Sequence, residues 1–187
     1  MADFYDKTHR SPIIAAVNNR NTLQDALKSP SEVIFLLTGD IMMLENVVAE
    51  AKQANKSLYI HIDLMEGLSK DFMSLKYVKE RIQPDGILTT KPNLIKYAKR
   101  LDVFVIQRLF ILDSISLDTG IKSLQAMKPD AVEIMPGIMP KVIRKISKES
   151  KTPVIAGGLI HEKSDIIDSL NAGSIAVSTS NKEVWYK

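Results

Sequence analysis

The sequence predicts an α/β fold, a compact (β/α)8 TIM barrel with a truncated last helix, formed by residues 1–187 as a single domain. Three observations predict it. Eight short apolar runs alternate with amphipathic segments of helical period. Their repeat of roughly 23 residues is what a minimal barrel of eight units requires. The turn after the first run (15–21) lacks the glycines that an open doubly wound sheet usually carries there.

The apolar runs are rich in valine, isoleucine and leucine without a polar alternation, which is typical of parallel strands buried on both faces. The residues before the first run are polar, so residues 1–10 are expected to form a loose N-terminal arm. The predicted strands cover 12–17, 33–37, 58–63, 86–89, 103–107, 131–135, 153–157 and 174–178.

The segments between the strands have apolar residues three and four positions apart, as amphipathic helices do. Pro92 and Pro140 suit the first turn of a helix, and Ser164 is expected to cap the helix that follows it. The best-marked helices are those over 44–55, 141–150 and 165–171.

The C-terminal end of the chain is too short for a full last helix. Only seven residues follow Ser180, and so the eighth helix is expected to be a stub. Trp185 and Tyr186 are expected to pack locally. Two alternatives are that they plug the barrel wall or that they contact a second subunit of a homo-oligomer.

The composition excludes several classes of site. The net charge of +3 and the pI of about 9.0 are compatible with an anionic partner. The chain has no cysteine, which excludes disulfides and thiolate sites, and its three histidines lack ligand spacing. Neither a metal nor a cofactor is therefore predicted. No apolar segment approaches the ~20 residues that a membrane span needs, and we expect a cytoplasmic protein without membrane contact.

Two predicted strands end in residues suited to bind an anion. In barrels, the carboxyl ends of strands seven and eight commonly form a phosphate site. Adjacent glycines let the backbone approach an anion, and hydroxyl groups at the start of the stub helix add donors. The alternative is a tight turn and an ordinary helix cap. The predicted phosphate-binding residues are Gly157, Gly158, Ser178, Thr179, Ser180 and Asn181.

Other predicted strand ends carry polar side chains that buried strands rarely contain. A buried carboxylate is costly unless it is paired. Asp63 and Glu133 could accept hydroxyl protons from a polyol, while Arg108 pairs with one of them or with a phosphate oxygen. The alternative is an ion-pair network that only holds the barrel together, with His61 as an ordinary core histidine. The predicted polyol-binding residues are His61, Asp63, Gln107, Arg108, Glu133 and Gly137.

No catalytic residue is identified by the sequence. The first strand ends without an acid or a base, and no lysine lies within a strand where a Schiff base would form. The alternative function is an enzyme acting on a small phosphorylated sugar or triose, with Asp63 and Glu133 as general acid and base. A third option is a barrel with a decayed site that serves as an interaction module. A binding pocket for a phosphorylated polyol accounts for the same residues at least as well.

Several of these stretches together resemble the glycerol uptake operon antiterminator regulatory proteins. The most specific are IQRLFILD within 104–114 and EIMPGIMP within 128–140. Further matching segments are 61–71, 84–99, 153–160 and 176–181, in the order and spacing of the family.

The resemblance implies a (β/α)8 barrel that senses glycerol 3-phosphate and acts on the leader mRNA of glycerol-utilisation genes to prevent early termination. It places the phosphate at Gly157, Gly158 and 178–181, and the glycerol end at Asp63, Arg108 and Glu133. The C-terminus ends sooner than is usual for the family.

The RNA partner follows from the resemblance alone, since the sequence has no RRM, KH or OB signature. One basic stripe could track RNA phosphates, and its binding would weaken steeply with salt. The alternative is a solvated helix face. The residues predicted to bind RNA are spaced three and four positions apart on one helix: Lys141, Arg144, Lys145 and Lys148.

Overall fold

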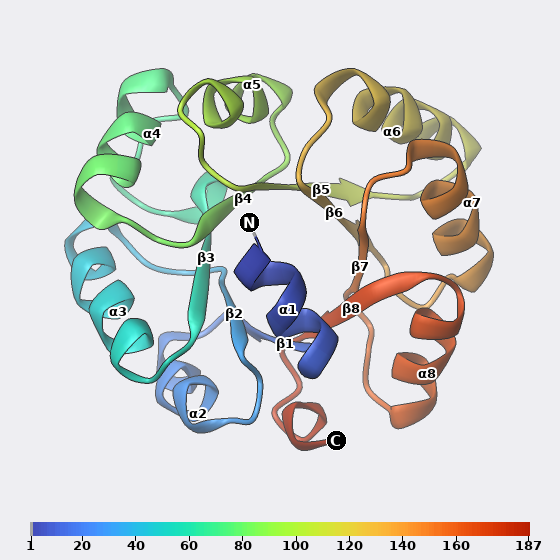
Figure 1. Ribbon diagram of the computed structural model, residues 1–187, viewed down its shortest axis with the longest axis horizontal. Helices are drawn as coiled ribbons and strands as arrows, with labels where there is room; N and C mark the ends of the chain where they lie inside the picture. Colours follow the sequence, from blue (N-terminus) through green and yellow to red (C-terminus); the bar gives the residue numbers. More distant parts are fainter. Residues whose placement is uncertain (1) are drawn as a thin grey trace.

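The computed structural model describes residues 2–187 and shows a closed barrel of eight parallel strands in chain order. The last strand pairs with the first and closes the barrel, with Ile14 opposite Ser178. Figure 1 looks down the barrel and shows the helices as an outer ring. The predicted (β/α)8 barrel is confirmed. The strands are β1 (Ile13–Val17), β2 (Val33–Leu36), β3 (Ser57–His61), β4 (Gly86–Thr89), β5 (Val105–Phe110), β6 (Ala131–Met135), β7 (Val154–Gly157) and β8 (Ser174–Thr179).

The helices that follow β1 to β7 cover the outside of the barrel with their apolar faces. Most of the core lies between these helices and the strands, and a second cluster fills the barrel interior. The helices are α1 (Ala2–Arg10), α2 (Leu23–Lys28), α3 (Ile41–Gln53), α4 (Phe72–Tyr77), α5 (Pro92–Arg100), α6 (Ser114–Met127), α7 (Pro140–Ser150) and α8 (Lys163–Asn171).

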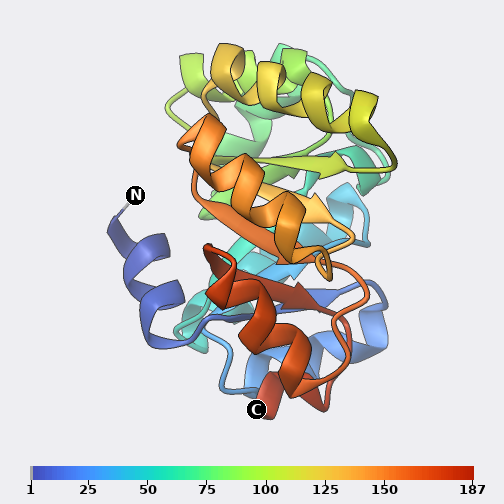
Figure 2. The same cartoon turned by 90° about the vertical axis from the view of Figure 1, so that its right-hand side faces the viewer.

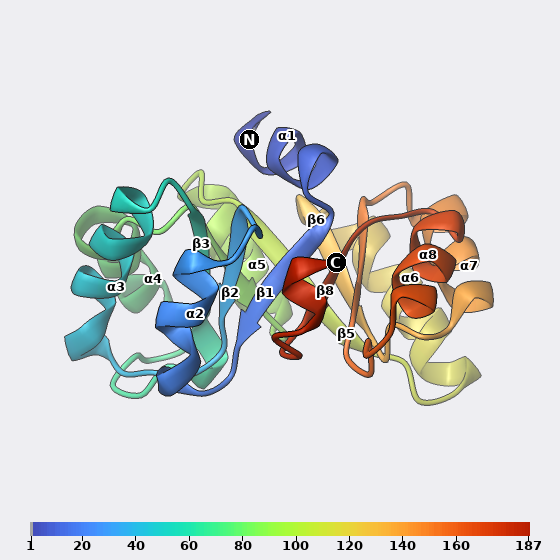
Figure 3. The same cartoon turned by 90° about the horizontal axis from the view of Figure 1, so that it is seen from below.

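Residues 2–10 are not the loose arm that the sequence predicts, because they form helix α1 across the N-terminal end of the barrel. Figures 2 and 3 show α1 beyond the end of the strands. The ring of Phe4 is 1% exposed and packs on Tyr59 and Phe104 at centroid distances of 5.1 and 5.0 Å. Burial of these aromatic rings stabilises a helix that has few apolar residues of its own.

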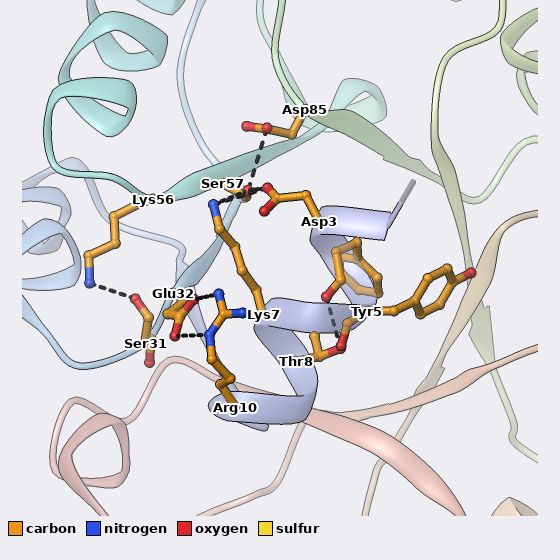
Figure 4. Close-up of polar contacts among 11 residues, drawn as sticks. Asp3, Tyr5, Lys7, Thr8, Arg10, Ser31, Glu32, Lys56, Ser57 and Asp85 are labelled. Carbon is orange, nitrogen blue, oxygen red and sulfur yellow. Dashed lines mark hydrogen bonds and ion pairs between the residues drawn. The ribbon is translucent and has the colours of Figure 1, made fainter.

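Polar contacts fix α1 around this aromatic cluster (Figure 4). Lys7 forms an ion pair with Asp3 and donates to the hydroxyl of Ser57 at the start of β3. Arg10 and Glu32 form a bidentate ion pair, in which Nε and Nη2 each donate to one carboxylate oxygen. The charges also suit the helix dipole, with an acid in the first turn and bases in the last.

The eighth helix is truncated, as predicted. After β8 there is one short 3-10 turn, η4 (Val184–Tyr186), which lies in the ring between α2 and α8 (Figure 1). Trp185 is 1% exposed and packs locally, and Tyr186 is 60% exposed. Trp185 belongs to the main hydrophobic core, which lies between the strands and the outer helices.

Ser164 does not cap α8, in contrast to the prediction. The helix begins at Lys163, two residues before the predicted start, and the carboxylate of Asp165 accepts hydrogen bonds from the N–H groups of His161 and Glu162. These two hydrogen bonds lower the pKa of Asp165. A carboxylate accepts such bonds better than a hydroxyl does, and this explains the shift.

Candidate functional site

A pocket of about 150 Å³ lies at the C-terminal end of the barrel. It is smaller than the ~300–1,000 Å³ pockets that bind drug-sized molecules, and so it suits a small metabolite. A larger hollow beside α1 holds no buried ion pair, whereas the floor of this pocket does. The pocket is lined by Ala16, Asn18, Leu37, Arg108, Glu133, Met135, Gly158, Leu159, Ile160, His161, Ser178, Thr179 and Ser180.

An ion pair between Arg108 of β5 and Glu133 of β6 forms the floor of the pocket. The two residues are partners in the β5–β6 register, and the Arg108 Nε lies 2.5 Å from Glu133 Oε2. Their side chains are 6% and 1% exposed. The hydroxyl of Ser178 in β8 donates to the other oxygen, Oε1. Both carboxylate oxygens are thus held, one from the adjacent strand β5 and the other from β8, as a buried charge requires.

One nitrogen of this network lacks a partner. Arg108 Nη2 is fully buried and donates to no acceptor within residues 2–187. Buried polar atoms are rarely left unpaired in native proteins, because each unpaired group costs about 1–3 kcal/mol. An oxygen atom of a ligand in the pocket would satisfy this donor.

Gly157 is required by the packing of this network. A Cβ atom at this position would lie 2.6 Å from Glu133 Oε1 and 2.7 Å from Ser178 Oγ. The first glycine of the pair therefore makes room for a carboxylate and a hydroxyl inside the barrel. The second, Gly158, lines the pocket and has a φ of +75°. Leu159 follows with a φ of +61°, a left-handed conformation that is uncommon for a leucine.

The hydroxyl cluster at the end of β8 has two roles. Thr179 donates to the carbonyl of Ile160 at 2.8 Å and accepts from the N–H of Asn181. The indole of Trp185 donates to the carbonyl of Thr179 at 2.8 Å. These contacts join the β7–α8 loop to the segment after β8. Ser180, by contrast, is an exposed side chain in the pocket lining.

His61 lies at the end of β3 and is 2% exposed. Its Nδ1 atom has no hydrogen-bond partner in the part of the chain that the structure describes. Burial lowers the pKa of His61 to about 4, with the positive charge of Arg108 acting in the same direction. The imidazole is therefore neutral near pH 7.

Four of the predicted polyol-binding residues lie outside the pocket lining: His61, Asp63, Gln107 and Gly137. Asp63 lies in a 3-10 turn after β3, and its carboxylate accepts from the hydroxyls of Thr89 and Thr90 at 2.8 and 2.9 Å. Gln107 is adjacent to Arg108 on β5 and hence faces the opposite side, where it donates to Ser123 of α6. Gln107 therefore does not line the pocket, in contrast to the prediction.

Gly137 serves the packing of the barrel wall. A Cβ atom there would lie 2.8 Å from the backbone of Gly157. Its N–H donates to the carbonyl of Gly158, and its carbonyl accepts from Ser169 of α8. Gly137 thus supports the β7–α8 loop from behind instead of facing the pocket.

The structure adds pocket residues that sequence reasoning missed. Asn18 follows β1 at the same end of the barrel as the predicted site, and its position just after a strand was the available signal. Leu159 and His161 belong to the loop that follows the two glycines. Within residues 2–187 there is no cluster of three or more acidic or histidine side chains that could hold a metal ion.

The predicted basic stripe lies on the outer face of α7. Lys141, Arg144, Lys145 and Lys148 are all exposed, and Lys145 forms an ion pair with Asp118 of α6. The helix starts at Pro140, directly after the β6–α7 loop. The stripe therefore runs down the side of the barrel from the end that carries the pocket. No helix within residues 2–187 has the length and hydropathy needed to cross a membrane.

Comparisons with known proteins agree with this architecture. A crystal structure of the glycerol uptake operon antiterminator regulatory protein from Listeria monocytogenes str. 4b F2365 is similar with a TM-score of 0.90 at 34% identity, covering 94% of this chain and 95% of that chain. A glycerol uptake operon antiterminator-related protein from Thermotoga maritima MSB8 gives a TM-score of 0.82 at 32% identity, covering 92% and 96%.

Sequence comparison leads to the same group. The uncharacterized protein YgcP of Escherichia coli (strain K12) is 40% identical over 176 residues, which cover 94% of this chain and 92% of that protein. The family model described as glycerol-3-phosphate responsive antiterminator matches residues 13–185, from the start of β1 to η4. The chain therefore belongs to the family of glycerol-3-phosphate responsive antiterminators.

Proposed function

We propose that this protein is a transcription antiterminator that binds glycerol 3-phosphate in the pocket and acts on the leader mRNA of glycerol-utilisation genes in the cytoplasm. One observation carries the proposal. The pocket of a member of this family ends in a buried Arg108–Glu133 pair whose guanidinium still has an unpaired donor. Such a floor complements a small hydroxylated ligand.

The phosphate of the ligand binds at the open end of the pocket in this proposal. Gly158 and Leu159 reverse the chain there through two successive left-handed residues, and Ser180 adds a hydroxyl from the segment after β8. Thr179 holds the two loops together through Ile160. The glycerol hydroxyls then point down toward Arg108, Glu133 and Ser178.

The leader mRNA binds along the basic stripe of α7 in this proposal. Lys141, Arg144 and Lys148 are exposed, and none of them is in an ion pair among the described residues. Cationic side chains at this spacing can follow a phosphate backbone. Because α7 begins next to the pocket, ligand binding can shift the equilibrium between RNA-competent and incompetent forms if the two forms differ in ligand affinity.

The enzyme alternative is not favoured by the placement of its two carboxylates. Asp63 is absent from the pocket lining and is held by Thr89 and Thr90, whereas Glu133 is bound to Arg108 and Ser178. A general acid and base must both reach the same substrate. Turnover of a phosphorylated sugar that is lost in Asp63→Asn, with ligand binding retained, would support an enzyme instead.

A thermal-shift titration tests the proposed ligand. Glycerol 3-phosphate is expected to raise the stability by ~2.7 kcal/mol at a hundredfold excess over its dissociation constant. Glycerol and inorganic phosphate, each carrying half of the ligand chemistry, should give little shift at the same concentrations. No shift with any of the three contradicts the proposal. The second step is an electrophoretic shift of leader RNA with and without ligand, where an unchanged RNA affinity contradicts the regulatory part.

A further inference from the structure

Building on the proposed function, we propose that Glu133 determines the specificity of the pocket. Its carboxylate admits phosphorylated polyols and excludes phosphorylated carboxylic acids of the same size. The chain thereby distinguishes an alcohol from the corresponding acid at the carbon farthest from the phosphate.

The negative charge at the pocket floor is fixed in place. Glu133 is 1% exposed and lines the pocket. Its Oε2 accepts from Arg108 Nε at 2.5 Å, and its Oε1 accepts from the hydroxyl of Ser178. Gly157 packs closely on the same carboxylate, since a Cβ atom there would lie 2.6 Å from Oε1. These contacts hold the side chain in place.

The floor requires a ligand group that both accepts and donates a hydrogen bond. Arg108 Nη2 is buried without a partner and needs an acceptor. Each oxygen of Glu133 retains a lone pair that needs a donor. A hydroxyl group meets both requirements. A ligand carboxylate meets only the first, and it would also place a second negative charge against Glu133, which is strongly unfavourable in a desolvated site.

The same geometry predicts what happens when the charge of Glu133 is removed. In Glu133→Gln the amide keeps the shape and still accepts from Ser178, but Arg108 becomes a buried cation without a counter-charge. A ligand carboxylate then supplies the missing partner through a charge-assisted hydrogen bond. The specificity should therefore move from the alcohol toward the acid.

The test compares two ligands that differ only at this carbon, glycerol 3-phosphate and 3-phosphoglycerate, by isothermal titration calorimetry. The unsubstituted protein should bind the alcohol at least ~100-fold more tightly than the acid. Glu133→Gln should reduce this ratio at least ~10-fold, through weaker binding of the alcohol and measurable binding of the acid. Glu183→Gln removes an exposed charge just beyond β8 and should leave the ratio unchanged.

A double variant covers the case in which Glu133→Gln does not fold. Arg108→Gln with Glu133→Gln removes both buried charges, and its ratio should fall toward one. The outcomes separate the two proposals. Binding of neither ligand by the unsubstituted protein overturns the function and the specificity together. Tight binding of glycerol 3-phosphate with equal binding of the acid, or with an unchanged ratio in both Glu133 variants, overturns only the role of Glu133.

Discussion

Gly157 and Glu133 face each other inside the barrel so closely that a Cβ atom on Gly157 would lie 2.6 Å from the Glu133 carboxylate. The glycine therefore sets the position of the charge that forms the pocket floor. Gly157→Ala should displace Glu133 and strain its contacts with Arg108 and Ser178. We expect a loss of about 1–3 kcal/mol in the free energy of unfolding and at least ~10-fold weaker binding of glycerol 3-phosphate.

Denaturant unfolding and calorimetry measure these two effects. Gly120→Ala is the matched control, because Gly120 is a buried glycine of α6 whose added Cβ would lie 3.1 Å from the end of Leu109 and 3.8 Å from the end of Ile111, both flexible side chains. That variant should retain full ligand affinity. Normal affinity in Gly157→Ala would show that the floor adapts to the extra methyl group.

His61 should make the stability of the protein depend on pH. Its pKa is lowered to about 4 in the folded state, mainly by burial and then by Arg108, while Asp63 opposes the shift and Lys70 adds to it slightly. Between pH 6.5 and 4, His61 is protonated in the unfolded chain but stays neutral in the folded chain. Neutral His61 therefore adds about 3 kcal/mol to the free energy of unfolding above pH 6.5, relative to pH 4. This stabilisation is lost as the pH falls from 6.5 toward 4.

Unfolding curves from pH 4 to 7 test this effect. His61→Gln should flatten the pH dependence over this window, whereas substitution of the exposed His9 in α1 should leave it intact. An identical pH dependence in His61→Gln and the unsubstituted protein would mean that other groups cause it.

Helix α1 should contribute strongly to stability and little to ligand binding. Phe4→Ala removes a fully buried ring from the aromatic cluster at the N-terminal end, which should cost about 3–5 kcal/mol. Tyr5→Phe removes only the hydrogen bond to the carbonyl of Asp130 and should cost about 1 kcal/mol. Guanidinium unfolding measures both. A loss below 1 kcal/mol for Phe4→Ala would contradict the packing role of α1.

The basic stripe of α7 should control the salt dependence of RNA binding. Removing Arg144 and Lys148 together should lower the slope of log K against log salt by about 1.4, since each phosphate contact on a single strand contributes ~0.7. Filter binding at several salt concentrations measures the slope. Lys28 and Lys52, exposed near the ends of α2 and α3, provide a control pair with the same charge change. Equal effects of the two pairs would place the RNA elsewhere.

The strands could be predicted because their residues are apolar on both faces, so the runs stand out without any alternation. Charged residues are rare in buried strands, and this predicted that Arg108 pairs with Asp63, with Glu133 or with a phosphate oxygen. The structure shows Glu133 as its partner. Gln107 was misassigned because two polar residues stand side by side on β5. The sequence does not reveal which of them faces inward, and only the register with Glu133 decides it.

Other features depend on contacts between distant segments. Helix α1 has few apolar residues, and its position is stabilised by the ring of Phe4 against strands that lie 55 and 100 residues further along the chain. The double glycine predicted a close approach of the backbone to a phosphate, and this stays a prediction. In the structure, Gly157 leaves room for the side chains of Glu133 and Ser178. The sequence does not reveal that Gly157 lies against Glu133 and Ser178, because the three residues are on different strands that meet only in the folded barrel.

Trp185 is the single tryptophan of the chain, and its indole donates a hydrogen bond to the carbonyl of Thr179, a residue of the pocket lining. Its intrinsic fluorescence is therefore a built-in optical probe of that segment, free of background from any other indole. A change in emission wavelength or in quenching by iodide on addition of ligand would report loop rearrangement directly, in real time and without a label. Stopped-flow mixing could then time the loop movement against the release or capture of RNA.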